Sequence, residues 1–429
     1  MENLVSMPKY ESYKNSDEDW IGSIPTHWDI KKLKHLFFEK KHTKNMELSC
    51  GAISFGEVIT KDDEKVLEST KKSYQEVLAG EFLVNPLNLN YDLVSLRIAL
   101  SKINVVVSAG YIVLKEKNII NKEYFKYFLH RYDVAYMKLL GSGVRQTISF
   151  NHIANTLLLF PPLEEQQHIA KFLDKKIAQI DGAIAIKEEQ INLLKERRQI
   201  IIHQAVTQGL DPSVPMKDSG VDWIGKIPQH WEIRRSKFLF TQRKERAWKN
   251  DVQLSATQAY GVIPQEQYEQ LTGKRVVKIQ FHLDKRKHVE KDDFVISMRS
   301  FQGGLERAWS QGCIRSSYVI LKPLENIEPA FYGYLLKLPS YIKALQRTAS
   351  FIRDGQDLNF ENFSQVDLFI PPINEQIDIA NYIETFTNSA DETTVLLEKQ
   401  IEKFKEYRAS LIHSAVTGKI KITPEMVED

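Results

Sequence analysis

Two long stretches of the chain repeat their apolar residues with the four-and-three spacing of helices that pack along a partner. From 163 to 205 there is no proline and one glycine, Gly182. The spacing runs through Leu173, Ile177, Ile180, Ile184, Lys187, Ile191, Leu194, Arg198, Ile201 and Ala205. A second series in the same register runs through Ile383, Thr387, Ala390, Thr394, Leu397, Ile401, Phe404, Arg408, Leu411 and Ala415. We therefore predict two helices that pair as an antiparallel coiled coil, the first about 64 Å long at 1.5 Å per residue.

Short motifs around these helices also occur twice. The segment DWIGSIPTHW (19–28) returns as DWIGKIPQHW (222–231), PPLEEQ (161–166) returns as PPINEQ (371–376), and IHQAVT (202–207) returns as IHSAVT (412–417). Each Pro-Pro is followed by acidic or amide residues, a combination that suits the start of a helix. The chain is therefore predicted to contain one structural unit twice.

The segments between the helices mix short apolar runs with aromatic-rich helical patterns. We predict strands at 81–84, 111–114, 293–296 and 318–321, and helices at 122–140 and 329–346. The fold class is then mixed α/β (α+β). The predicted organisation is an N-terminal α/β domain at 1–160, a helical spacer at 161–210, a second α/β domain at 211–370 and a second spacer at 371–429.

Charge is distributed unevenly between these parts. Residues 20–160 hold 19 Lys/Arg and 14 Asp/Glu, and residues 223–370 hold 23 and 16, whereas the rest of the chain holds 16 and 26. Two basic blocks on acidic connectors favour nucleic-acid contact by the blocks. Two cysteines and the absence of a long apolar run lead us to expect a protein of the reducing cytoplasm, with no disulfide framework, metal site or membrane span.

Polar loops in each block carry groups that can recognise base edges. Arginine can bind guanine through two hydrogen bonds, and asparagine or glutamine can bind adenine in the same way. The predicted DNA-binding residues are Asn85, Asn88, Asn90, Arg145 and Gln146 in the first block, and Arg299, Ser300, Gln302, Arg353 and Gln356 in the second. Any of these residues could instead be an ordinary solvated turn residue or a phosphate contact.

The duplicated tryptophans and histidines are expected to have structural roles. Trp20, Trp28, Trp223 and Trp231 belong to the repeated motif, so packing against the scaffold is favoured over stacking on bases. His203 and His413 lie on the long helices without a nearby carboxylate pair or cysteine, which favours helix packing or partner contact over catalysis.

The duplicated WIGxIPxHW motif, the PPxxEQ helix starts and the HxAVT segments resemble those of Type I restriction–modification specificity subunits (HsdS) along essentially the whole chain. The resemblance implies that each block binds half of a split, asymmetric DNA sequence. It also implies that the helices dock two modification (methyltransferase) subunits, and that restriction subunits join this core. Expected partner-binding residues are Glu165, Gln166, Arg198, His203, Glu375, Gln376, Arg408 and His413. S-adenosylmethionine, ATP and magnesium are expected on the partner subunits, and none on this chain.

An enzymatic function and a scaffold function are the alternatives to DNA recognition. An amino-methyltransferase needs an Asn/Asp-Pro-Pro-Tyr-type loop, but the segment at 85–88 reads NPLN, and no Walker motif for a translocase is present. A nuclease site could be drawn from Asp29, Glu39 and Lys41, although lysine-rich helices produce that spacing by chance. The chain is therefore expected to be non-catalytic. A protein-interaction scaffold without DNA specificity remains the alternative.

Overall fold

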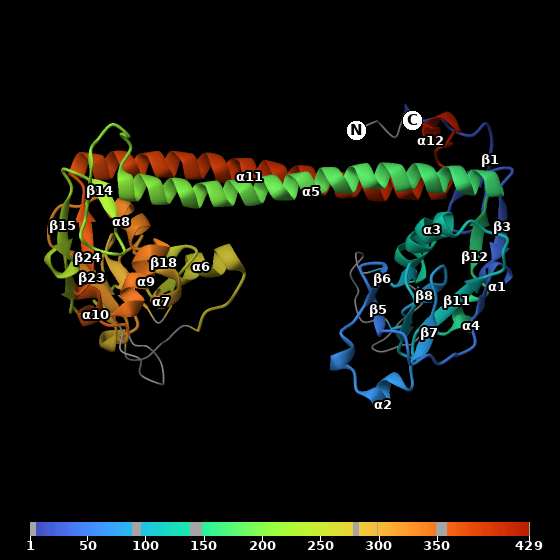
Figure 1. Cartoon of the computed structure of the whole chain (residues 1–429), viewed down its shortest axis with the longest axis horizontal. Coiled ribbons are helices and arrows are strands. Elements are labelled where there is room, and N and C mark those ends of the chain that lie inside the picture. Colours follow the sequence, from blue (N-terminus) through green and yellow to red (C-terminus); the bar gives the residue numbers. More distant parts are fainter. Residues whose placement is uncertain are drawn as a thin grey trace. The chain divides into compact units, whose positions relative to one another are not determined.

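The computed structural model describes residues 6–87, 96–137, 148–277, 283–297, 299–348 and 358–428. The chain forms two compact units (Figure 1). Unit 1 comprises Met1–Glu188 together with Glu398–Asp429, and unit 2 comprises Glu189–Leu397. Unit 2 is therefore one continuous piece of chain, whereas unit 1 is assembled from both ends of the sequence.

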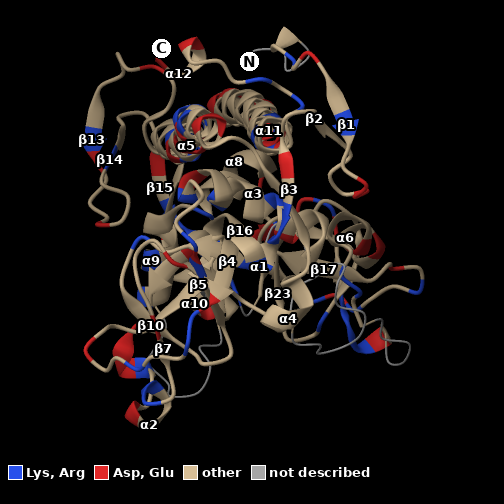
Figure 2. Ribbon diagram, turned by 90° about the vertical axis from the view of Figure 1, so that its right-hand side faces the viewer, with Lys and Arg blue, Asp and Glu red and all other residues tan. Residues whose placement is uncertain are grey.

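Two long helices take part in both units. Helix α5 spans Leu163–Gln208 and helix α11 spans Ile373–Val416. Within each unit they lie side by side (Figure 2). In unit 1 Arg408 Nε lies 3.5 Å from Asp181 Oδ1, and in unit 2 Arg198 Nη1 donates to Asp391 Oδ1 at 3.0 Å. A later residue of α5 thus meets an earlier residue of α11, so the helices run antiparallel, as the sequence predicts.

The predicted seam lies largely inside these helix pairs. Leu173, Ile191, Ile383 and Leu411 are buried, and most other seam positions are buried or half-buried. The polar member Thr387 is only 8% exposed. Burial at four-and-three spacing is what makes this sequence helical here, because burying an apolar stripe stabilises a long helix more than local propensity does.

The recognition block of unit 1 is built on an antiparallel sheet in the order β4-β11-β8-β9, accompanied by the two-stranded ladders β1-β2, β12-β3, β5-β6 and β10-β7. The elements of unit 1 are β1 (Tyr13–Asn15), β2 (Ser23–Pro25), β3 (Asp29–Lys32), α1 (Leu33–Leu36), β4 (Phe37–Glu39), β5 (Gly51–Ser54), β6 (Glu57–Thr60), α2 (Glu68–Lys71), β7 (Gln75–Val77), β8 (Phe82–Val84), β9 (Ile98–Leu100), β10 (Val105–Val107), β11 (Ile112–Glu116), α3 (Lys122–Ala135), α4 (Phe150–Ile153), β12 (Leu157–Phe160) and α12 (Glu425–Glu428).

Unit 2 repeats this topology. Its sheet has the order β16-β23-β20-β21, and its ladders β13-β14, β15-β24, β17-β18 and β19-β22 match those of unit 1 one by one. The elements of unit 2 are β13 (Met216–Asp218), β14 (Lys226–Pro228), β15 (Glu232–Arg235), β16 (Phe240–Arg243), β17 (Leu254–Thr257), β18 (Gly261–Pro264), α6 (Gln265–Thr272), β19 (Lys287–Val289), β20 (Phe294–Ile296), α7 (Ser300–Gly303), β21 (Glu306–Arg307), β22 (Gly312–Ile314), β23 (Val319–Pro323), α8 (Pro329–Leu335), α9 (Pro339–Arg347), α10 (Phe360–Ser364) and β24 (Asp367–Ile370).

The helix predicted at 329–346 is wrong in one respect, because the structure has two helices there. Helix α8 ends at Leu335, and α9 begins at Pro339. Leu338 has extended angles, φ −62° and ψ 135°. A proline disfavours helical angles at the residue before it and has no N–H for the preceding turn, so the helix restarts with Pro339 in its first turn.

The end of the chain completes the core of unit 1. Leu411, Ala415, Val416, Ile420 and Ile422 are buried in the same cluster as Trp28. In unit 2 the equivalent place beside Trp231 is taken by Ala205 and Val206, from the middle of the chain. The repeated HxAVT segments are therefore the pieces of helix that close each core.

Two glycine variants, at Gly418 and at Gly182, test whether the segment after α11 packs into the core of unit 1. Gly418 has φ +72°, and a Cβ there would lie 2.5 Å from Pro25 Cδ, so we expect Gly418→Ala to destabilise unit 1 by about 1–3 kcal/mol. Gly182 lies in α5, and a Cβ there would have nothing within 4 Å, so Gly182→Ala should stabilise by up to about 1 kcal/mol. Urea unfolding of both variants measures the difference. Equal urea midpoints for the two variants would contradict the packing of this segment against Pro25.

Candidate functional site

The repeated motifs of unit 1 meet at one carboxylate. Glu165 Oε2, in the first turn of α5, accepts hydrogen bonds from Trp28 Nε1 at 3.0 Å and from the Tyr10 hydroxyl at 2.7 Å. Its Oε1 lies 2.5 Å from His27 Nε2. Burial, and then the bond to Glu165, raise the pKa of Tyr10 well above its ordinary value, so the phenol remains a donor. The tryptophan motif and the helix start are thus joined by direct contact.

Unit 2 repeats this junction nearly atom for atom. Glu375 Oε2 accepts from Trp231 Nε1 at 3.0 Å, and its Oε1 lies 2.6 Å from His230 Nε2. Trp28 and Trp231 are fully buried, as expected for packing residues. Trp20 packs against Phe128 and Tyr132, and Trp223 packs against Tyr341 and Phe369.

The glutamine beside each carboxylate ties the helix start to the recognition block. Gln166 accepts from the Asn121 N–H at 2.8 Å and donates to the Pro161 carbonyl at 2.8 Å. Gln376 accepts from the Glu328 N–H at 2.9 Å and donates to the Pro371 carbonyl at 2.8 Å. Asn121 and Glu328 are the residues that cap α3 and α8. Each glutamine therefore holds the start of the helix that follows the last strand of its block's four-stranded sheet, α3 or α8.

Glu165, Gln166, Glu375 and Gln376, which we expect to bind partners, make these contacts within their own unit. The two glutamines are 0% and 2% exposed, and the two glutamates bind residues of their own unit. In this conformation the PPxxEQ motif joins parts of one chain, and its glutamines offer no surface to another subunit. We call the contacts of Glu165 and Gln166, and those of Glu375 and Gln376, the junctions.

The other residues expected to bind partners lie elsewhere on the long helices. Arg198 and Arg408 form the cross-helix ion pairs with Asp391 and Asp181. His203 is exposed. His413 is partly buried with its Nε2 2.8 Å from Lys419 Nζ, and burial, together with Arg131 and Lys419, lowers its pKa to about 4. The neutral imidazole is therefore the form held at neutral pH.

Unit 2 contains a large open cleft between the end of α5 and the recognition block, with a volume of about 1460 Å³. Its charged lining residues are Arg198, Arg307 and Lys337, and His203 also lines it. No acidic residue is among the described residues that line the cleft. Arg307 and Lys337 pair with Asp292 and Glu306, which are not part of the lining. Arg198 likewise pairs with Asp391, so the lining itself carries cations whose acidic partners lie outside it.

Aromatic and amide side chains share the cleft with these cations. Tyr260, Trp309 and Tyr334 line it together with six glutamines, Gln199, Gln204, Gln208, Gln258, Gln267 and Gln302. The Arg307 guanidinium lies 4.5 Å from the centre of the Trp309 ring. Cations, π-faces and amides capable of two hydrogen bonds are the groups that contact phosphates and bases.

The predicted DNA-binding residues of unit 2 have different surroundings. Gln302 is exposed and lines the cleft. Arg299 is exposed, its carbonyl accepts from the cleft residue Gln258 at 3.2 Å, and its guanidinium has no ion pair with any described residue. Ser300 is 1% exposed and its Oγ accepts from the Ser297 N–H at 2.9 Å, so its hydroxyl is used inside the turn.

In unit 1 only one predicted DNA-binding residue is described. Asn85 is half-buried and its Oδ1 accepts from the Leu87 N–H at 3.1 Å, which shapes the turn after β8. Predicted residues that lie outside the described parts of the chain are Asn88, Asn90, Arg145 and Gln146, as well as Arg353 and Gln356 of unit 2.

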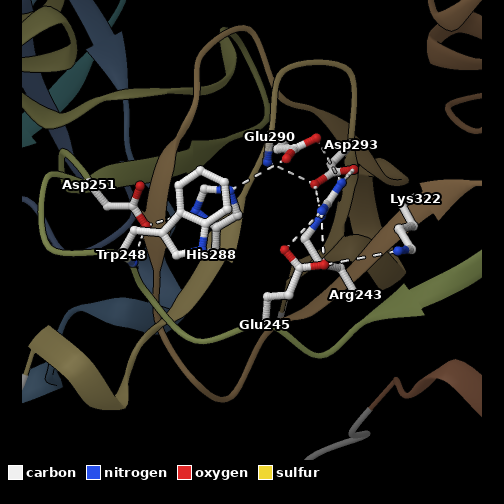
Figure 3. Close-up of polar contacts among 8 residues, drawn as sticks. All are labelled: Arg243, Glu245, Trp248, Asp251, His288, Glu290, Asp293 and Lys322. Carbon is white, nitrogen blue, oxygen red and sulfur yellow. Dashed lines mark hydrogen bonds and ion pairs between the residues drawn. The ribbon is translucent and has the colours of Figure 1, made fainter.

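A charged cluster beside β16 is a third feature of unit 2 (Figure 3). Arg243 binds Asp293 at 2.6 Å and also contacts Glu245 and Glu290 at 3.2 and 3.1 Å. Its counterpart in unit 1 is Lys40, which binds Glu76 and Glu81 at 3.1 and 2.8 Å. Arg243 ends β16 and Lys40 directly follows β4, and each holds the acid that precedes β20 or β8, Asp293 or Glu81. Glu245, His288 and Glu290 could together approach a metal ion, but both glutamates already contact Arg243.

Comparison with known proteins agrees with the duplicated architecture. A family model described as "Type I restriction modification DNA specificity domain" matches residues 28–196 and 228–403. The two matches cover most of the chain. The chain belongs to this family.

Individual relatives extend the match. The chain is 23% identical over 452 residues to a putative type I restriction enzyme MjaX specificity subunit of Methanocaldococcus jannaschii, covering 98% of this chain and 99% of the relative. It is 24% identical over 326 residues to the EcoBI specificity subunit of Escherichia coli, covering 70% and 66%.

Two solved structures share the fold. The HsdS subunit from Thermoanaerobacter tengcongensis is similar at a TM-score of 0.52 and 15% identity, covering 92% of this chain and 98% of that one. A chain from a study of complex assembly and conformational transition of the type I R-M system is similar at a TM-score of 0.64 and 14% identity, with the same coverage. None of the described helices combines the length and apolar content needed to span a bilayer.

The cleft contains residues that sequence analysis missed. Tyr260, Arg307, Trp309 and Lys337 line the cleft of unit 2 but belong to no duplicated motif. One signal was available: Arg307-Ala308-Trp309 places a cation and an exposed indole two residues apart in an extended segment, which puts both on one face. Arg307 and Trp309 lie near Tyr260 because Ala308 pairs with Val262 of β18. This pairing cannot be read from the local sequence pattern.

The junctions predict a sharp contrast between neighbouring glutamates. Glu165→Ala should destabilise the protein by about 1–3 kcal/mol, because the buried Trp28 Nε1 and the Tyr10 hydroxyl lose their acceptor. Glu164→Ala removes an exposed charge from the same helix turn and should cost less than about 1 kcal/mol. Urea unfolding compares the two, and similar losses would argue against the junction.

Proposed function

We propose that this chain is the subunit that selects the DNA site of a Type I restriction–modification enzyme, with each unit binding one half of a split, asymmetric sequence. Family membership supports DNA recognition. The division into two halves is supported by the repeated topology, because the junctions are nearly identical in both units while the loops differ. The hairpin turn is Phe55-Gly56 in unit 1 and Gln258-Ala259-Tyr260 in unit 2. A constant frame with different loops suits two different base sequences.

In unit 2 the proposed DNA surface is the cleft and its rim. Arg299, Gln302, Arg307 and Lys337 place cations and an amide around it. Phosphate contacts from the lysine and arginines would set affinity, and Arg299 or Gln302 would contact base edges. Asn85, Asn88, Asn90, Arg145, Gln146, Arg353 and Gln356 remain proposed DNA contacts of the polar loops.

The long helices are the proposed docking surface for modification subunits. Ile186 and Leu193 lie seven residues apart on α5 and are 62% and 53% exposed. On α11 Leu396 is 59% exposed. Such a stripe fits the apolar face of a partner helix. Arg408 and His413 remain proposed partner contacts, as do Arg198 and His203, which also line the cleft. S-adenosylmethionine, ATP and magnesium would be bound by the partners.

Replacing one block tests the division of labour. Exchanging 223–370 for the matching segment of a relative with another specificity should change one half of the methylated sequence and preserve the other. The measurement is genome-wide sequencing of methylated bases in cells that express the variant with its modification subunit. An active variant that altered both halves would contradict independent recognition.

The chain alone should bind DNA without altering it. Because catalysis is assigned to the partners, we expect no methyl transfer and no strand cleavage by a purified preparation free of them. Addition of the modification subunit should restore methylation. Turnover by the chain alone, retained after further purification, would overturn this assignment. A salt-dependent gel shift distinguishes DNA binding from the alternative of a protein-interaction scaffold.

Arg299 tests base recognition at the cleft rim. If its guanidinium binds a guanine, Arg299→Ala should cost about 1–3 kcal/mol of affinity and relax preference at one base position. If it contacts a phosphate, affinity should fall evenly for all sequences. Titration of single-base variants of the site distinguishes these results. Unchanged binding to every variant would remove Arg299 from the proposed surface.

A further inference from the structure

The tip of the β5–β6 hairpin exposes an aromatic side chain at a position where the backbone disfavours it. Phe55 is 82% exposed and has φ +48°, and Gly56 follows with φ +79°. Ser54 pairs with Glu57, so these two residues form the whole loop. Two successive positive φ angles define the type I′ turn, for which Asn-Gly is the preferred sequence. A bulky residue at such an angle costs free energy, and an exposed ring recovers little of it by burial.

The matching hairpin in unit 2 shows where such a tip lies. The loop between β17 and β18 is Gln258-Ala259-Tyr260, and all three residues line the cationic cleft. Tyr260 is 39% exposed. Gly261, with φ +70°, fits so closely against β21 that a Cβ would lie 2.7 Å from both the Arg307 carbonyl and Trp309 Nε1. This loop is therefore held firmly beside the stacked Arg307 and Trp309.

We propose that this hairpin turn is a wedge that inserts its aromatic side chain between stacked base pairs, Phe55 in the half-site of unit 1 and Tyr260 in that of unit 2. The inference rests on the proposed function, since it requires each unit to hold DNA. Apolar side chains that enter a base step unstack it and bend the duplex, and every base offers a face to an aromatic ring. The cations around the unit 2 loop favour a polyanion over a protein surface.

The wedge explains the sequence of the turn. Asn-Gly adopts the positive φ angles of this turn at a lower free-energy cost than Phe-Gly does. The hairpin is therefore less stable than it could be, and it carries an exposed ring instead. That trade gives a test in which the altered protein should fold at least as well as the original. Phe55→Asn keeps the turn and removes the ring, and Leu67→Ala is the control, because Leu67 is 75% exposed in unit 1 but lies outside the hairpin.

The experiment uses the chain assembled with its modification subunit and a duplex carrying the sequence that this assembly methylates. 2-Aminopurine, which fluoresces when unstacked, is placed at successive positions of both half-sites. We expect the original protein to unstack one step in each half apart from the methylated base. Phe55→Asn should lose that signal in one half only, with affinity reduced about 10-fold or more and an equal or higher Tm. Tyr260→Ala should lose the signal in the other half, and Leu67→Ala should change neither.

The other possible results would overturn either the wedge or the proposed function. If the original assembly unstacks no step besides the methylated base, or if Phe55→Asn retains both affinity and fluorescence pattern, the wedge is wrong while DNA recognition stands. If the original assembly does not bind the duplex, the proposed function fails with it.

Discussion

One carboxylate at the start of each long helix holds the two kinds of duplicated motif together. Glu165 and Glu375 each accept a hydrogen bond from a fully buried tryptophan and lie beside the adjacent histidine. Removing the carboxylate would leave an indole N–H buried without a partner, which costs more than the bond itself contributes. The helix start cannot therefore rotate or slide without breaking several contacts, and each recognition block has a fixed attachment to its helix.

This attachment explains why one frame can serve two surfaces. Gln166 and Gln376 extend it to Asn121 and Glu328, the capping residues of α3 and α8, while Lys40 and Arg243 fix the sheet at its first strand. The described residues of the hairpin tips and of the loops after β8 and β20 take no part in these contacts. Their side chains are therefore free to differ between the units without loss of the fold.

The sequence predicts much of this architecture but few of its contacts. The coiled-coil seam, the duplication and the strands around Phe82, Ile112, Phe294 and Val319 follow from local periodicity, which the structure confirms. The junction does not follow, because it joins Trp28 to a glutamate 137 positions away, and a polar residue at a helix start looks the same whether it faces solvent or a buried indole. Ser300 and Gln302 illustrate the same limit: they lie two residues apart in the short helix α7, yet Ser300 is buried and Gln302 is exposed.

The central claim is that each unit faces its own half of the DNA site. It is tested most directly by attaching an iron chelate that cleaves nearby DNA to one engineered cysteine at a time, Glu57→Cys beside the unit 1 hairpin or Gln302→Cys in the unit 2 cleft. Both positions are exposed, whereas the native Cys50 and Cys313 are buried. With the assembled methyltransferase bound to its site, the account predicts cleavage in one half from position 57 and in the other half from position 302. Cleavage of the same half from both positions would contradict it.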